Sequence, residues 1–179
     1  MKFKKQLPKL EKPNGIYFIT FVTWERLELT PEARQVVLDA CRFVDRKRYH
    51  LFAVVIMTDH VHLLIQTWRK TLTSGNYLET DRNYLETDRN YLETDSEQDA
   101  RTPEFWSLGS IMHSIKSYSS KQIPKVMKHI GKVWQDGKYD EMIRDRQEFQ
   151  KKWEYIRQNP VKAGLSATPE VYPFFWETF

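Results

Sequence analysis

Two histidines separated by one residue, His60 and His62, have a type and spacing that suit metal chemistry. The segment 60–66, HVHLLIQ, predicts a β-strand, in which residues two apart point to the same face. Both imidazoles therefore project together and can hold a divalent metal ion with one or two further ligands. Separate structural hydrogen bonds are the alternative for such a pair. A histidine triad would need a third histidine at position 64, where the sequence has Leu64.

A second polar pair, Tyr118 and Gln122, is spaced four residues apart in a segment with a helical pattern. Residues at this spacing lie on one face of a helix, one turn from each other. Gln122 falls within the apolar stripe of the predicted helix and Tyr118 at its margin. We expect this face to pack on the sheet, so that both polar ends meet the histidines. A boundary tyrosine and a surface-edge glutamine are the alternative.

The segments that must position these residues predict strands and helices in a defined order. Strands are predicted for residues 16–24, 50–57 and 60–66 and within 134–144, and helices for 31–48, for 107–123 and from Asp145 to before Asn159. Pro124 is expected to end or kink the second helix. The order β, α, β-hairpin, α, β, α predicts an α+β fold, a ferredoxin-like antiparallel sheet with helices packed on one face. We expect a single domain over residues 1–179.

A short acidic repeat lies between the two halves of the candidate site. NYLETDR occurs twice in succession from Asn76 and is followed by NYLETD. Its Tyr and Leu are adjacent, whereas a coiled coil needs apolar residues spaced by three and four. We interpret residues 70–103 as a flexible surface insertion. Residues 76–99 hold eight acidic side chains and two arginines, so the rest of the chain has 26 basic against 16 acidic residues. The chain outside the repeat is therefore distinctly basic.

Composition limits the class of protein. The chain has 179 residues, of which 40% are hydrophobic, enough to bury one core. No segment approaches about 18 uninterrupted apolar residues, so we expect no membrane span. The single cysteine, Cys41, cannot form an internal disulfide and lies on a helical apolar stripe, where a buried thiol is expected. These features suit a cytoplasmic protein of a bacterium.

Several segments together resemble a known family. VIMTDHVHLLIQ resembles the His-hydrophobe-His signature of HUH endonucleases in their single-tyrosine transposase version, and SIKSYSSKQI resembles the catalytic helix of that family. VWQDGKYDEMIRD, WEYIRQNPVKAGL and EVYP resemble the C-terminal pattern of REP-associated tyrosine transposases. The matches follow the family order from about Ile16 to Pro173, outside the insertion.

This resemblance implies a chemistry for the two polar pairs. His60 and His62 would bind a metal ion, Mg²⁺ or Mn²⁺, with Gln122 as the third ligand. Tyr118 would attack a phosphate of single-stranded DNA and form a 5′-phosphotyrosine with a free 3′-hydroxyl. The resemblance therefore implies a metal-dependent single-strand DNA endonuclease and strand transferase acting at hairpin-forming repeats.

The same resemblance implies a nucleoid-associated enzyme that works as a monomer or a homodimer on hairpin DNA. Five cations are candidate contacts to DNA phosphates: Lys116, Lys121, Arg144, Arg157 and Lys162. Trp24, Trp106 and Trp134 are candidates for stacking on unpaired bases, with core packing as the alternative for each.

The chain departs from the family before the first histidine, where Thr58-Asp59 replaces the usual Pro-Asn. Asp59 adds a negative charge beside the metal site, which either tightens metal binding or caps the turn. A domesticated protein that binds DNA hairpins with little cleavage is the alternative function, and the acidic repeat favours it. A metal-dependent nucleotide hydrolase is less consistent with the sequence, because no Gly-rich phosphate loop is present among six glycines.

Overall fold

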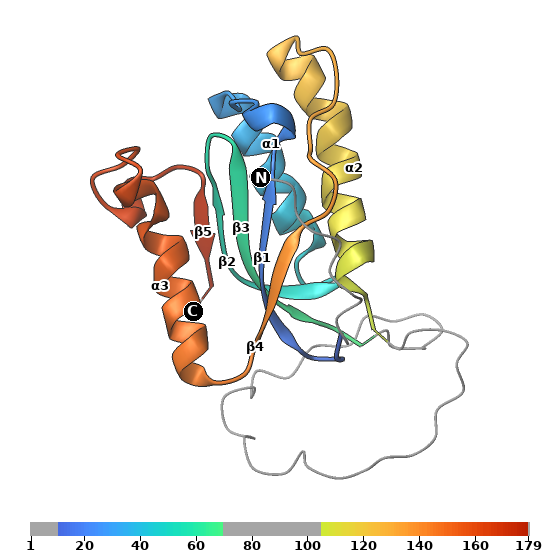
Figure 1. Cartoon of the computed structure of the whole chain (residues 1–179), viewed down its shortest axis with the longest axis vertical. Helices are drawn as coiled ribbons and strands as arrows, with labels where there is room; N and C mark the ends of the chain where they lie inside the picture. The colour runs from blue at the N-terminus through green and yellow to red at the C-terminus, as the bar shows by residue number, and fades with distance from the viewer. Residues whose placement is uncertain (1–10, 70–104, 179) are drawn as a thin grey trace.

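A five-stranded sheet forms the centre of the protein, with strand order β4-β1-β3-β2-β5 and antiparallel neighbours throughout (Figure 1). The computed structural model describes residues 11–69 and 105–178. Its strands are β1 (Ile16–Val22), β2 (Tyr49–Ile56), β3 (His60–Thr67), β4 (Tyr139–Ile143) and β5 (Phe175–Glu177). The predicted α+β fold with an antiparallel sheet is confirmed.

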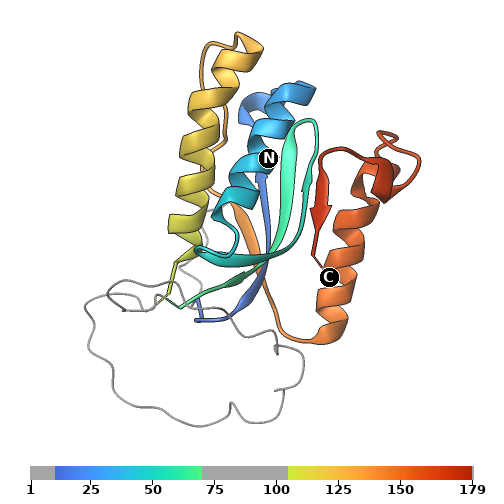
Figure 2. The same ribbon diagram turned by 180° about the vertical axis from the view of Figure 1, so that it is seen from behind.

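The first two helices cover one face of this sheet. They are α1 (Pro31–Val44) and α2 (Leu108–Met127), which lie side by side in both views of the chain (Figures 1 and 2). As expected, Thr30 caps α1 by accepting from the Ala33 N–H, with Pro31 at the first position. Together with β1 to β4, these two helices form the predicted ferredoxin-like arrangement.

The third helix, α3 (Arg146–Lys162), packs on the opposite face of the sheet, apart from α1 and α2 (Figures 1 and 2). Its ring contacts show the face: Phe149 meets Phe52 of β2, and Tyr155 meets Phe18 of β1. The expectation that the helices share one face therefore holds for α1 and α2 but not for α3. Asp145 caps α3 by accepting from the Glu148 N–H, as predicted.

Two prolines interrupt their helices less than predicted. Pro124 lies inside α2, which continues to Met127 and ends at Lys128 in the left-handed conformation, φ 52°. Pro160 lies in the last turn of α3, which continues to Lys162. A proline loses only one backbone donor, and near the end of a helix few further hydrogen bonds depend on it. The predicted helix ends before these two prolines were therefore wrong, and the kink that was the alternative at Pro124 stays a prediction.

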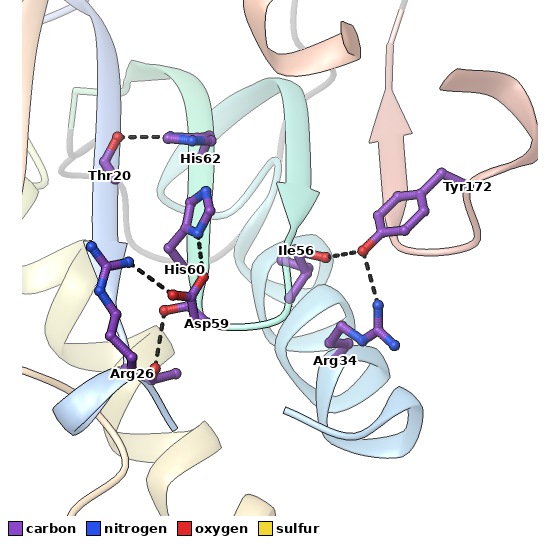
Figure 3. A network of polar contacts seen from close by, with 9 residues as sticks. Thr20, Arg26, Arg34, Ile56, Asp59, His60, His62 and Tyr172 are labelled. Atoms are coloured by element: carbon purple, nitrogen blue, oxygen red, sulfur yellow. Dashed lines mark hydrogen bonds and ion pairs between the residues drawn. The ribbon is translucent and has the colours of Figure 1, made fainter. Parts of the chain in front are cut away.

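The C-terminal segment returns to the sheet through a short 3₁₀ helix, η2 (Pro169–Val171), and β5, which pairs with β2. The Tyr172 hydroxyl donates to the Ile56 carbonyl at 2.8 Å and accepts from Arg34 at 3.0 Å (Figure 3). These bonds join the chain end to β2 and α1. The sequence patterns did not predict β5, because its three residues are too few for a periodic signal.

The predicted insertion at 70–103 lies outside the described residues, but its flanks are described. Arg69 and Phe105 form an isolated antiparallel bridge, and the Trp106 N–H donates to the Trp68 carbonyl at 3.1 Å. The chain therefore leaves and re-enters the domain at one place. Within the described residues, no helix is long and apolar enough to cross a membrane.

Candidate functional site

The two histidines lie on β3, near the middle of the sheet. In the antiparallel register His60 is opposite Val22 and His62 opposite Thr20, and directly opposed residues share a face. The imidazole ring centroids of the two histidines are 4.8 Å apart. The expectation that both side chains project together is thus confirmed, and the face they share is the one on which α3 packs.

His60 is oriented by a carboxylate. Its Nδ1 lies 2.6 Å from the Asp59 Oδ1, and the Asp59 Oδ2 accepts from Arg26 at 2.9 Å (Figure 3). A carboxylate only accepts hydrogen bonds, so Nδ1 carries the proton and a neutral His60 presents its Nε2 lone pair. Hydrogen bonds from His60 and Arg26 outweigh burial and lower the pKa of Asp59. Asp59 therefore fixes the orientation of His60, the first candidate metal ligand, through the Nδ1 of its ring.

His62 is buried and neutral. Its Nδ1 lies 2.7 Å from the Thr20 hydroxyl, and its side chain is 4% exposed. Burial, followed by electrostatic interactions with His60 and Lys152, lowers the pKa of His62 to about 3. Within the described part of the chain, its buried Nε2 has no hydrogen-bond partner. A buried nitrogen without a partner costs free energy, and a metal ion would satisfy it.

Tyr155 of α3 lies over the face of the sheet that carries the two histidines. Its ring centroid lies 5.1 Å from that of His62 and 5.8 Å from that of Phe18. The side chain is 42% exposed, so the phenol remains accessible to a ligand. The fold thus places Tyr155 in ring contact with His62, whereas Tyr139, which borders the same pocket, donates its hydroxyl to Glu141.

These residues line one open groove of about 790 Å³ between the sheet and α3, which we call the histidine groove. Its lining comprises Phe18, Thr20, Val22, Arg26, His60, His62, Tyr139, Glu141, Glu148, Lys151, Lys152 and Tyr155. A second hollow lies along α3, and Tyr155 borders both. An extended ligand could therefore pass Tyr155 while lying across α3.

Tyr118 and Gln122 do not meet the histidines. They lie on α2, whose Lys116 is 5.4 Å above the Phe21 ring, and Phe21 points to the face opposite Thr20 and His62. Tyr118 is 52% exposed, and Gln122 accepts from Lys125 at 3.3 Å. The expectation that this pair faces the histidines was wrong. An amphipathic pattern identifies the buried side of a helix but not the face of the sheet that it covers.

Two of the five predicted DNA contacts are already engaged within the protein. Lys116 donates to the Gln135 and Gly137 carbonyls at 2.9 and 2.6 Å, and burial lowers its pKa to about 8. Arg157 is paired with Glu170 and Glu177, and its side chain is 17% exposed. Both cations already have partners within the protein, which does not favour a phosphate contact, and their role in DNA binding stays a prediction.

The other three predicted contacts, Lys121, Arg144 and Lys162, are exposed. Lys162 lines the hollow along α3 that Tyr155 borders. Of the predicted stacking residues, Trp134 is 4% exposed and donates to Ser119 in the core, whereas Trp24 is 39% exposed. Trp24 therefore stays a candidate and Trp134 does not.

Tyr155 is the residue that the sequence analysis missed, although a signal was present. It lies three residues before Gln158 and four before Asn159, in the segment WEYIRQNPVKAGL, which carries the most specific family resemblance. The same segment ends the helix that the sequence predicts from Asp145 to before Asn159. Placing Tyr155 required knowing that α3 covers the histidine face.

The residues present fit a divalent metal ion in part. Two imidazoles share a face, each with its Nδ1 held by an oxygen, and the second has an unpaired buried Nε2. Among the described residues, no third histidine, cysteine, aspartate or glutamate joins them in a cluster. Such a two-histidine site leaves coordination positions for water or for oxygen atoms of a substrate.

Comparison of the sequence with protein families found no match, and comparison with curated proteins found none. The structure is similar to a solved structure of a REP-associated tyrosine transposase bound to a REP hairpin. The TM-score is 0.61 at 20% identity, over 96% of this chain and 82% of that one. A protein of Deinococcus radiodurans R1, provisionally identified as a transposase, has a TM-score of 0.46 at 17% identity, over 86% of this chain and 95% of that one. The chain therefore has the fold of a REP-associated tyrosine transposase, in agreement with the resemblance in its sequence.

Proposed function

We propose that the protein is a metal-dependent single-strand DNA endonuclease and strand transferase, a transposase that acts at hairpin-forming repeats, with Tyr155 as its nucleophile. The observation that carries this proposal is the 5.1 Å separation of the Tyr155 and His62 rings at the histidine groove. A tyrosine near two imidazoles that share a face brings a nucleophile to a candidate metal site.

His60 and His62 would hold Mg²⁺ or Mn²⁺ through their Nε2 atoms. The bound ion would polarise the phosphoryl oxygens and stabilise the negative charge of the transition state. Asp59 keeps His60 in the tautomer that leaves Nε2 unprotonated. Gln122 lies on the other face of the sheet, so water or DNA oxygens would complete the coordination in its place.

Tyr155 would perform the covalent step. Its phenol oxygen loses a proton and bonds to the scissile phosphorus, and the 3′-oxygen of the preceding nucleotide leaves and is protonated. The protein then carries a 5′-phosphotyrosine, and the DNA carries a free 3′-hydroxyl. The phosphodiester is conserved, so another 3′-hydroxyl can attack the phosphotyrosine and rejoin strands without ATP.

Hairpin DNA is the proposed partner because the similar solved transposase is bound to a REP hairpin. Exposed cations beside the groove support a polyanionic ligand: Lys151 lines it, and Lys162 lines the hollow on the other side of Tyr155. One chain supplies both histidines and Tyr155, which supports a monomer over a homodimer that exchanges tyrosines. The proposed setting is the nucleoid of a bacterial cytoplasm.

A covalent-adduct assay tests this function. Purified protein would be incubated with labelled single-stranded DNA that folds into a hairpin with unpaired flanks, in Mn²⁺ or in EDTA. We expect an adduct in Mn²⁺ alone, its loss in Tyr155→Phe and its retention in Tyr118→Phe. Tight binding of the hairpin without any adduct would instead support the domesticated DNA-binding protein.

A further inference from the structure

Lys152 lies one helical turn before Tyr155 on α3, at a spacing of three residues that places both on one face of the helix. Both side chains line the histidine groove together with His60 and His62. The Lys152 side chain is 27% exposed, so its ammonium group is partly shielded from water. A cation in such a place interacts more strongly with an anion than one at the open surface.

The Lys152 ammonium group is held in position by its neighbours. Its Nζ lies 2.8 Å from the Glu141 Oε2 on β4 and 4.7 Å from the centre of the Phe18 ring on β1. The same Glu141 oxygen accepts from the Tyr139 hydroxyl at 3.0 Å. An ammonium group has three donors, so the bond to Glu141 leaves capacity for another acceptor.

Phe18 links this cation to the other groups of the site. Its ring stacks on His62 at a centroid distance of 5.4 Å and meets the edge of Tyr155 at 5.8 Å. The Phe18 ring is therefore in contact with Lys152, His62 and Tyr155. A phosphate placed between Tyr155 and the histidine pair would lie beside the ammonium group.

The other cations of the groove are placed differently. Arg26 is 54% exposed and paired with Asp59, behind the histidines. Lys151 is exposed and precedes Lys152 by one residue, so it points about 100° away around the helix. Lys152 is thus the partly buried cation that shares its helix face with Tyr155.

We propose that Lys152 binds a non-bridging oxygen of the scissile phosphate, and that Glu141 positions its ammonium group for this contact. The inference rests on the proposed function and adds a phosphate-binding residue to the same site. The contact is a charge-assisted hydrogen bond, strongest when negative charge builds on the phosphate during attack by Tyr155. No proton is transferred to or from Lys152.

The first test compares Lys152→Met and Lys152→Arg with Lys138→Met. Lys138 is a matched control, because it pairs with Asp140 at 2.7 Å, its side chain is 17% exposed, and it does not line the groove. At saturating DNA in Mn²⁺, we expect Lys152→Met to slow adduct formation by about 100-fold to 1,000-fold, the usual cost of losing one donor to transition-state charge. Lys152→Arg should recover part of the rate, and Lys138→Met should match the wild type.

The second test needs neither metal nor cleavage. Affinity for a single-stranded oligonucleotide would be measured in EDTA over a range of salt concentrations. Loss of one phosphate contact should reduce the slope of log K against log salt by about 0.7 in Lys152→Met. An adduct rate and a salt slope like those of the wild type in Lys152→Met would overturn the proposal. If the wild type forms no adduct, the proposed catalysis fails, while the salt slope still decides whether Lys152 contacts phosphate.

Discussion

Each histidine of the candidate site has its Nδ1 held by a different neighbour. Asp59 accepts from His60, and the Thr20 hydroxyl lies beside His62. The sequence left two roles open for Asp59, a tighter metal site or a capped turn. Its hydrogen bond to His60 Nδ1 supports the first role, because a carboxylate behind a ligand histidine raises the basicity of that histidine.

We therefore expect Asp59→Ala to weaken Mn²⁺ binding by about 10-fold to 100-fold, the usual effect of losing such a partner. Asp59→Asn should weaken it less, since the amide oxygen still accepts from Nδ1. Calorimetric titration of the metal-free protein measures both affinities. Asp136→Ala is the control, because this side chain is 88% exposed and pairs with Lys132. Unchanged binding in Asp59→Ala would contradict the role of Asp59.

His62 should make the stability of the metal-free protein depend on pH. Its pKa is lowered to about 3 by burial and by electrostatic interactions with His60 and Lys152, whereas an unfolded histidine titrates near 6.5. Between these values the unfolded chain binds a proton that the folded chain does not. Stability should therefore fall as the pH falls through this window, by up to about 1.4 kcal/mol per pH unit.

The measurement is urea unfolding in EDTA at a series of pH values, for the wild type and for His62→Gln. The variant should lose less free energy of unfolding on acidification, whatever its stability at neutral pH. Equal pH dependence in the two proteins would show that His62 does not titrate in the way its burial implies.

At the scale of elements, α3 determines which tyrosine lies at the site, because it covers the face of the sheet that carries His60 and His62. Arg157 connects α3 to η2 and β5 through Glu170 and Glu177. The Glu177 side chain is only 12% exposed, so removal of Arg157 would leave the negative charge of its carboxylate poorly compensated. We expect Arg157→Met to cost about 1–3 kcal/mol of unfolding free energy, less than a fully buried pair because Glu170 remains exposed.

The same variant should leave DNA affinity unchanged, since Arg157 is engaged within the protein. Lys162→Met is its counterpart, with weaker DNA binding and a change in stability within about 0.5 kcal/mol, as for most surface substitutions. Urea unfolding and a DNA-binding titration on both variants separate the two roles. Weaker DNA binding in a stable Arg157→Met protein would contradict the assignment of Arg157 to structure.

The sequence predicted the elements better than their mutual placement. Strand and helix periodicity located β1 to β4 and α1 to α3, and the alternation of β3 correctly placed His60 and His62 on one face. Periodicity cannot tell which face of a sheet a helix covers, so Tyr118 was predicted on a helix that packs on the other face. The engagement of Lys116 and Arg157 also depends on partners distant in sequence, which a basic residue does not reveal by itself.

At the scale of the whole molecule, the acidic repeat joins a chain that is otherwise basic. The bridge between Arg69 and Phe105 closes the domain at the base of residues 70–104. Loop length has a small thermodynamic effect, about 0.6 kcal/mol for each doubling. The repeat should therefore act on DNA binding through its charge more than on folding.

Deletion of residues 76–99 removes a net charge of −6. We expect the free energy of unfolding to change by less than about 1 kcal/mol, and the affinity for single-stranded DNA to increase, most strongly at low salt. A Gly/Ser segment of equal length should have the same effect on affinity, which separates charge from length. Unchanged affinity in both variants would show that the repeat does not oppose DNA binding.

In the proposed reaction Tyr155, and not Tyr118, carries the covalent bond to DNA. Tryptic digestion of the Mn²⁺-dependent adduct and mass spectrometry would identify the modified residue directly. Cleavage after lysine and arginine releases Tyr155 within residues 153–157 and Tyr118 within residues 117–121, so the two peptides differ in mass. We predict the nucleotide on the peptide that contains Tyr155. A nucleotide on the peptide that contains Tyr118 would contradict the site described at the histidine groove.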